Sequence, residues 1–313
     1  MRSIKRWVFA TFILTFLVII AGAVVRTTQS GMGCPDWPKC FGRWIPPTNA
    51  SQLPPDFEKY LHKQDIDHTF NPFHTWIEYI NRLFATLLGI FAIVQFLLIY
   101  RKKQLLKISY KLSLIFLALV IIVGLFGAIV VKYNLAHLSI SVHLLLAIAM
   151  TQVELALLLS LKEKLSSIKV DRNFRKMMIA FLVILLIQSS LGTMVRMYVD
   201  DISKILHYEH RENWLAAMPT AFLIHRTFSW IVLISAVYLT WKYRNVAAIN
   251  RKLHLLLTIV LLNMITGIIL FYADIPAVAQ PIHVLLASLA ITQLINILLQ
   301  TTNKHGFLNT GHV

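Results

Sequence analysis

Eight long apolar runs constrain this chain more than any other feature of its sequence. Each run is about 20 residues long, which is the length of α-helix that crosses the hydrocarbon core of a bilayer. Only 14% of the 313 residues are charged, too few to cover the surface of a soluble protein of this length. The sequence therefore predicts an all-α integral membrane protein with eight transmembrane helices. The runs are residues 7–25, 76–100, 111–131, 138–161, 177–195, 219–241, 253–272 and 279–299.

The positive charge of the chain marks its orientation in the membrane. The formal net charge is +16, and most of the lysine and arginine lies at the N-terminus and in the connections 101–111, 162–176 and 242–252. These are alternate connections, as expected when lysine and arginine stay on the cytoplasmic side. We therefore predict a multi-pass protein of the bacterial inner membrane with both termini in the cytoplasm, and no nucleic-acid partner. The first run continues to Val25 without a small-residue cleavage site, which predicts a retained helix rather than a signal peptide.

This orientation places two long loops outside, at residues 26–75 and 196–219. The only two cysteines, Cys34 and Cys40, lie in the first loop. An isolated pair in an oxidising compartment predicts a disulfide, and two free thiols are the alternative. A zinc site is less favoured because the histidines of the loop, His62 and His68, are far along the chain. Nothing in the sequence supports a redox-active role over a structural one.

The chain also repeats itself. The second half contains counterparts, in the same order, of three motifs from the first half. We therefore predict two related four-helix bundles, residues 1–165 and 166–313, related by a pseudo-symmetry axis along the membrane normal. The matched motifs are Gly22-Ala-Val-Val-Arg26 with Gly192-Thr-Met-Val-Arg196, Ile80-Asn-Arg-Leu-Phe84 with Ile224-His-Arg-Thr-Phe228, and the sixteen-residue spacing of Gly127 and His143 with that of Gly267 and His283.

Three histidines lie within the predicted helices at a common depth. His143, His225 and His283 are each one to two turns below the outer end of a helix, about 7–10 Å into the membrane. Such residues are expensive in a membrane, so a functional role is favoured over a helix–helix hydrogen bond. His225 and His283 belong to the same half, and facing helices of a four-helix bundle often supply paired axial ligands to haem iron. Zinc or copper would require more ligands than these two.

The first half has the same helix motifs as the second, but different residues at two of the equivalent positions. His143 matches His283, but Asn81 stands where His225 would predict a histidine. One turn earlier, Glu78 replaces the apolar Phe222, and a buried carboxylate is costly unless it is paired or protonated. His74, Glu78 and Asn81 share one helical face. The second half therefore resembles a site for a resident cofactor, and the first half resembles the same pocket with residues suited to catalysis.

Four arginines mark the outer ends of helices in both halves. They either extend to the interface as ordinary charged residues or bind haem propionates, since a guanidinium grips a carboxylate through two hydrogen bonds. These residues are Arg26, Arg82, Arg196 and Arg226.

These motifs together resemble the haem A synthase family over nearly the whole chain. The most specific is Gly22-Ala-Val-Val-Arg26 followed by Thr28-Gln-Ser-Gly-Met-Gly-Cys34-Pro-Asp-Trp-Pro-Lys-Cys40; Glu78-Tyr-Ile-Asn-Arg82 and Phe222-Leu-Ile-His225-Arg226 also match. The resemblance implies an oxidoreductase that converts the C8 methyl group of haem O to the formyl group of haem A, for terminal oxidases.

The resemblance also implies roles for individual residues. His225 and His283 would ligate a permanent haem b, His143 would ligate the substrate haem, and Glu78 would be the catalytic carboxylate. The family has histidine at the position of Asn81, so the second axial ligand is open here: none, His74 or Asn81. Many relatives carry a second cysteine pair in the later outer loop, and residues 196–219 contain none. Contact with haem O synthase, with an electron-transfer partner or with a second copy in a homo-oligomer is left open, as are the electron acceptor and the oxygen source.

Two other functions compete with this one. A haem b electron-transfer protein that reacts with quinone explains the histidines, but it gives Glu78 and the difference between the halves no role. A transporter is suggested by the repeat, but such folds usually break helices at the midplane. Here glycine and proline cluster near helix ends and loops. The enzyme is therefore favoured.

Overall fold

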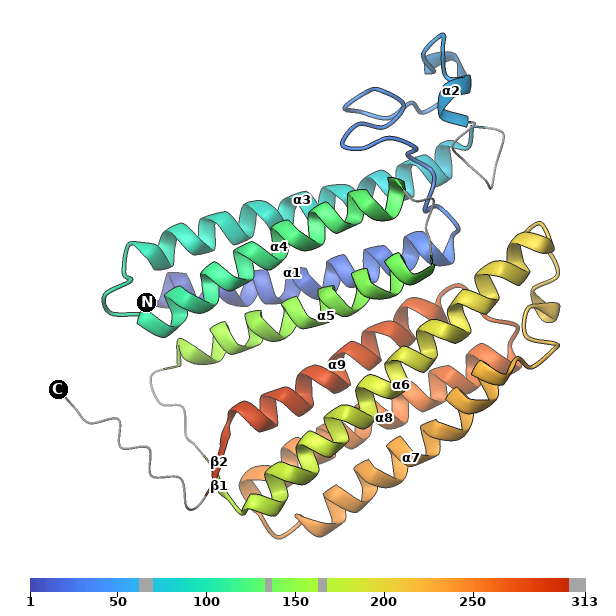
Figure 1. Cartoon of the computed structure of the whole chain (residues 1–313). Coiled ribbons are helices and arrows are strands. Elements are labelled where there is room, and N and C mark those ends of the chain that lie inside the picture. The colour runs from blue at the N-terminus through green and yellow to red at the C-terminus, as the bar shows by residue number, and fades with distance from the viewer. Residues whose placement is uncertain (62–69, 133–136, 163–167, 304–313) are drawn as a thin grey trace.

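The described part of the chain contains eight long, apolar helices, as the sequence predicts. The computed structural model describes residues 1–61, 70–132, 137–162 and 168–303. The long helices are α1 (Arg2–Thr27), α3 (Pro72–Tyr100), α4 (Lys107–Lys132), α5 (His137–Ser160), α6 (Arg172–Ile205), α7 (Thr220–Lys242), α8 (Ala247–Tyr272) and α9 (Ala279–Leu299) (Figure 1). Short elements are η1 (Ala50–Gln52), α2 (Glu58–Leu61), η2 (Arg211–Asn213) and the strands β1 (Ile168–Val170) and β2 (Thr301–Asn303). The all-α integral membrane class is confirmed.

The helices pack in two rings of four. In the first ring α1 packs against α3 and α5, and α4 packs against the same two helices; in the second, α6 and α8 each pack against α7 and α9 (Figure 1). Thus α3 and α5 are diagonal partners in one ring, and α7 and α9 are diagonal partners in the other. Helix α9 also contacts α1 and α5, which joins the rings. The assignment of residues 1–165 and 166–313 to two domains that arose by duplication stays a prediction.

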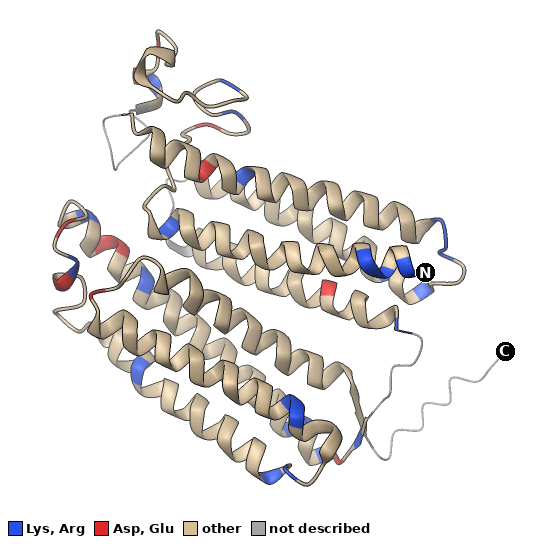
Figure 2. Cartoon of the chain, turned by 180° about the vertical axis from the view of Figure 1, so that it is seen from behind, with Lys and Arg blue, Asp and Glu red and all other residues tan. Residues whose placement is uncertain are grey.

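The outer surface of both rings is apolar. Large side chains such as Ile90, Leu97, Ile234 and Leu262 are more than two-fifths exposed. In water this surface would drive aggregation, whereas lipid chains solvate it. Figure 2 shows that lysine and arginine lie mainly near helix ends and connections, with long uncharged stretches between them.

Helix α6 is longer than the sequence predicts. We expected it to end at Arg196, but it continues to Ile205, so the second outer connection begins at residue 206. The prediction was wrong because it followed hydropathy, and the last turns of α6 are polar. They are held by an ion pair one turn apart, in which Arg196 Nη2 lies 2.8 Å from Asp200 Oδ1.

Polar contacts join helices inside each ring and between the rings. In the first ring, Gln95 on α3 donates through Nε2 to Glu154 Oε2 on α5, at 2.9 Å, and both residues are buried. Between the rings, Gln152 Nε2 on α5 donates to Thr292 Oγ1 on α9, at 3.1 Å. Because hydrocarbon offers no hydrogen-bonding partner, such contacts fix which helix faces pack together.

Candidate functional site

Two imidazoles from the diagonal helices α7 and α9 meet inside the second ring. The ring centres of His225 and His283 are 6.5 Å apart, and the ring planes are inclined at 72°. A metal–imidazole bond is about 2 Å long and a ring centre lies roughly 1 Å behind its nitrogen, so two imidazoles on opposite sides of one metal have centres roughly 6 Å apart. The separation of His225 and His283 fits that arrangement.

A glycine on a neighbouring helix makes room for each imidazole. A Cβ atom added at Gly192 on α6 would lie 3.2 Å from Cε1 of His225, and one added at Gly267 on α8 would lie 3.3 Å from Cε1 of His283. Both distances are shorter than ordinary van der Waals contact. The two glycines therefore allow α6 and α8 to pack closely against the histidines.

A hydrogen bond orients one of the two second-ring imidazoles for ligation. Thr266 Oγ1 lies 2.9 Å from Nδ1 of His283, which leaves Nε2 as the ligating nitrogen. Gln188 Nε2 donates to the backbone carbonyl of His225 at 3.2 Å. In the described part of the chain the buried Nδ1 of His225 has no hydrogen-bond partner. Two imidazoles whose ring centres are 6.5 Å apart fit haem iron. Among the described residues, no three His, Cys, Asp or Glu side chains gather to hold a metal ion.

The first ring repeats this arrangement with different side chains. A Cβ atom added at Gly127 on α4 would lie 3.5 Å from Cε1 of His143, and one added at Gly22 on α1 would lie 3.9 Å from Oδ1 of Asn81. Asn81 lies beside Gly22 as His225 lies beside Gly192, so the two side chains occupy equivalent positions in the two rings. His143 has no counterpart of the Thr266 hydrogen bond, because Phe126 stands there and its ring centre lies 6.3 Å from that of His143.

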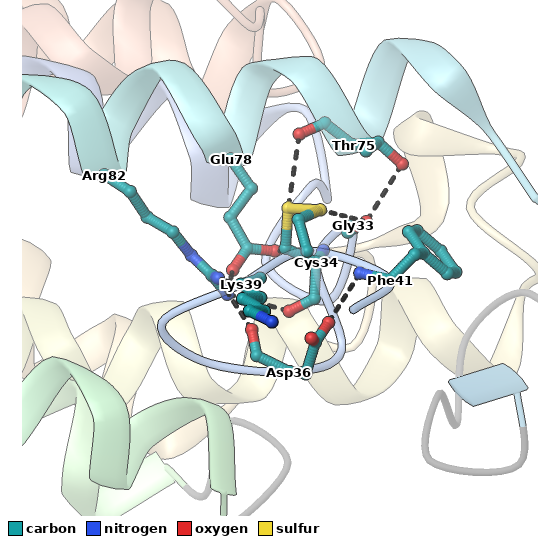
Figure 3. Close-up of polar contacts among 9 residues, drawn as sticks. Gly33, Cys34, Asp36, Lys39, Phe41, Thr75, Glu78 and Arg82 are labelled. Atoms are coloured by element: carbon teal, nitrogen blue, oxygen red, sulfur yellow. Dashed lines mark hydrogen bonds and ion pairs between the residues drawn. A yellow bond between two sulfur atoms is a disulfide. The ribbon is translucent and has the colours of Figure 1, made fainter. Parts of the chain in front are cut away.

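Glu78 on α3 is buried and fully engaged (Figure 3). One carboxylate oxygen, Oε2, accepts a hydrogen bond from the backbone N–H of Cys34 at 2.8 Å. The other, Oε1, is 2.6 Å from Nη2 of Arg82, one turn along the helix. The charge is thus paired, which offsets the cost of burying it.

Arg82 joins α3 to the loop between α1 and α3 (Figure 3). Its guanidinium donates to the backbone carbonyls of Asp36 at 2.7 Å, Lys39 at 2.9 Å and Cys34 at 2.8 Å. Glu78 is its fourth partner. Arg82 thus holds residues 33–40, the cysteine segment, against α3. Because these four contacts occupy the guanidinium, they compete with the propionate binding predicted for Arg82.

The loop segment itself is compact and lies directly on α3. The predicted Cys34–Cys40 disulfide is present, and there is no free cysteine. Thr75 Oγ1 donates to the carbonyl of Gly33 at 2.9 Å, and a Cβ atom at Gly33 would lie 2.3 Å from the carbonyl oxygen of His74. Only glycine permits this approach. His62 and His68, considered above for a zinc site, lie outside the described residues.

His74 is on α3 but far from the level of Asn81. Seven residues separate the two, which corresponds to about 10 Å along a helix axis. The prediction that His74, Glu78 and Asn81 share one face agrees with their spacing on a regular helix. His74 nevertheless lies near the outer end of α3, under the cysteine segment.

Two of the predicted arginines share one carboxylate at the junction of the two rings. Arg26 on α1 pairs with Asp200 on α6, and Arg196 pairs with the same carboxylate at 2.8 Å. Arg196 also donates to the carbonyl of Arg26 at 3.0 Å and to the side chain of Gln280. Arg226 differs: it is exposed, its Cζ lies 5.8 Å from the ring centre of Phe271, and it has no ion pair in the described part of the chain.

Removing the shared carboxylate should destabilise the junction between the rings. Asp200→Ala leaves two partly buried arginines facing each other without a counter-charge, and we expect a loss of about 1–3 kcal/mol in the free energy of unfolding. The midpoint of denaturation in detergent measures this. Glu209→Ala, which removes an exposed carboxylate near the same end of the molecule, is the matched control. Equal midpoints for the two variants would contradict this role of Asp200.

Sequence reasoning missed three residues of these sites. Asp200, Thr266 and Gln280 have no motif of their own. The i,i+4 spacing of Arg196 and Asp200 was a usable signal, but it lay beyond the predicted end of the helix. The partner of Nδ1 in His283 could be found only from the packing of α8 on α9.

The fold and site define a polytopic helical membrane protein with a paired-imidazole site between diagonal helices. The model of the family described as cytochrome oxidase assembly protein matches residues 5–295. The chain belongs to that family.

Individual relatives agree with the family match. A haem A synthase of Flavobacterium psychrophilum is 22% identical over 322 residues, covering 90% of this chain and 93% of the relative. A haem A synthase of Wolbachia sp. subsp. Brugia malayi is 24% identical, covering 88% and 90%. A haem A synthase of Shewanella oneidensis is 32% identical over 156 residues, covering 49% of this chain; there the chain spans only 44% of the relative's length.

Proposed function

We propose that this protein is a haem A synthase, which oxidises the C8 methyl group of haem O to the formyl group of haem A. The observation that carries the proposal is the close approach of His225 and His283 across the second ring. The first ring has the same arrangement of glycines, but Asn81 stands at one of the two histidine positions. The family match over residues 5–295 and the names of the relatives support the same activity. A haem b protein that only exchanges electrons with quinone would leave the altered first ring without a role.

In the second ring we assign His225 and His283 as the residues that would hold a resident haem b through its iron. When bound there, this group supplies one-electron redox chemistry. Thr266 holds the tautomer and orientation of His283, and the apolar interior of the ring excludes water. Arg226 is free to bind a propionate, and the Arg26–Asp200–Arg196 cluster has one positive charge in excess, which would stabilise a second propionate.

In the first ring we assign His143 as the ligand of the substrate haem O. Conversion of the methyl group to a formyl group is a four-electron oxidation that adds one oxygen atom, so it requires an external oxidant and an oxygen source, water or O2; two successive hydroxylations followed by loss of water from the gem-diol would accomplish it. Glu78 is the carboxylate that we expect to accept protons from the reacting carbon or its hydroxyl group, and Arg82 positions it. The cysteine segment, which Glu78 and Arg82 hold against α3, would cover the substrate pocket of the first ring and limit the access of water.

We further propose that the protein lies in the bacterial inner membrane with both termini in the cytoplasm. Lysine and arginine on alternate connections support that orientation. In this orientation the histidine sites lie near the outer leaflet. Haem O, membrane-soluble through its apolar tail, would reach the first ring from the lipid phase.

Haem analysis tests the activity directly. The protein is expressed with and without a haem O synthase in a host that makes no haem A, and the extracted haems are identified by mass spectrometry. We expect haem b alone without the haem O synthase, and haem b with haem O and haem A when it is present. Protein that carries haem b alone in both cases would contradict the proposal and favour the electron-transfer protein.

A further inference from the structure

The two rings differ at one axial position, and this difference defines a binding site in the first ring. Four glycines mark four equivalent places: Gly192 and Gly267 face His225 and His283, while Gly127 and Gly22 face His143 and Asn81. Three of the four places hold an imidazole. The fourth holds the shorter, non-basic amide of Asn81.

An asparagine cannot replace the missing imidazole as an iron ligand. Iron takes imidazole nitrogen readily, whereas amide oxygen suits hard cations such as calcium or magnesium. The amide is also shorter, since its terminal atoms are two bonds from Cβ and the Nε2 atom of histidine is three. An iron held by His143 would therefore have no protein ligand from the α3 position.

His74 does not fill the vacant coordination position either. It lies seven residues, or about 10 Å, further along α3. Its backbone is fixed beneath the cysteine segment, where the carbonyl of His74 meets Gly33. A shift of two helical turns would break the contacts of Glu78 and Arg82 with the same segment.

Asn81 is free to bind something else. Its side chain makes no hydrogen bond to another described residue, although it lies within the membrane-spanning part of α3, where polar groups need partners. An amide offers two N–H donors and one acceptor. In haem pockets, hydrogen-bond donors opposite the protein ligand decide which small molecules bind to the iron.

We propose that the first ring binds the substrate haem through His143 alone and holds a small exogenous ligand, water or a diatomic molecule, on the opposite face of the iron. The Asn81 amide donates a hydrogen bond to that ligand. This inference rests on the proposed function, because it requires haem O in the first ring. It distinguishes a substrate site with one protein ligand and one exchangeable coordination position from a resident site with two protein ligands in one chain.

Carbon monoxide is the probe for the open position. In reduced protein purified with haem O, we expect a carbon monoxide difference spectrum in proportion to bound haem O. Asn81→His should supply the missing imidazole, abolish that spectrum and convert the haem O signal from high-spin to low-spin. Ile80→His places the same imidazole on the adjacent, lipid-exposed position and should leave carbon monoxide binding intact.

A second variant tests the hydrogen bond without adding a ligand. Asn81→Leu should still bind carbon monoxide, but with a shifted C–O stretching frequency in the infrared spectrum, because the donor is lost. An unchanged frequency would overturn the role of the amide. A low-spin haem O that fails to bind carbon monoxide in the unaltered protein would overturn the open position.

The haem content separates the failure of this inference from failure of the proposed function. If the purified protein contains haem O but the iron is closed to carbon monoxide, only the inference falls. If no haem O or haem A is bound under any condition, the proposed function falls and the inference falls with it.

Discussion

Leucine at Gly192 or Gly267 should remove haem b from the protein. A single added Cβ already comes within 3.2 Å of His225 or 3.3 Å of His283, so a branched side chain must push the imidazole out of its position. Displacing a ligand or its immediate support typically lowers metal affinity about 10- to 100-fold. Leucine is a larger change than these, so we expect the affinity for haem b to fall at least that much and purified protein to carry clearly less haem b per chain.

The control for this experiment is a glycine without a neighbour. Nothing lies within 4 Å of a Cβ atom added at Gly124 on α4, so Gly124→Leu should keep its haem b and fold normally. Chromatography in detergent confirms that each variant is monodisperse before the spectra are compared. Full haem b content in Gly192→Leu and Gly267→Leu would show that the glycines do not shape the pocket.

The second large effect is expected at Glu78. Glu78→Gln keeps an oxygen that can accept the Cys34 N–H but loses the negative charge and the ability to take a proton. If Glu78 moves protons during the oxidation, conversion of haem O to haem A should fall about 100-fold or more, as is typical for loss of a general base. Haem b should remain bound, because His225 and His283 are on other helices.

A comparison with alanine separates chemistry from loop anchoring. Glu78→Ala loses both the charge and the hydrogen bond to Cys34, so the cysteine segment should become more sensitive to protease, whereas Glu78→Gln should not. Conversion by Glu78→Gln at nearly the unaltered rate, with only Glu78→Ala impaired, would make Glu78 an anchor of the loop and remove it from the reaction.

The membrane-spanning framework was predictable because length and hydropathy determine it. All eight helices were expected from apolar runs. The outer end of α6 was not, since its last turns are polar and are held by Arg196 and Asp200 rather than by lipid. The i,i+4 pair of Arg196 and Asp200 is a local signal, but the contact of Asp200 with Arg26 on α1 has none.

The candidate site was partly predictable because three sequence motifs recur in the two halves of the chain. Matching the halves placed His143, His225, His283 and Asn81 in equivalent positions, and the structure puts a glycine against each. The pairing of Glu78 with Arg82 was readable from their i,i+4 spacing. The three loop carbonyls that Arg82 binds were not, because they depend on how residues 34–39 fold back onto α3.

The most direct test of the account is the haem spectrum of protein in which both second-ring histidines are replaced. We predict that His225→Ala/His283→Ala, reduced with dithionite, lacks the low-spin haem b bands, while His254→Ala on α8, which removes an exposed histidine of the same ring, retains them. Low-spin haem b of unchanged intensity in the double variant would mean that these two imidazoles do not share an iron.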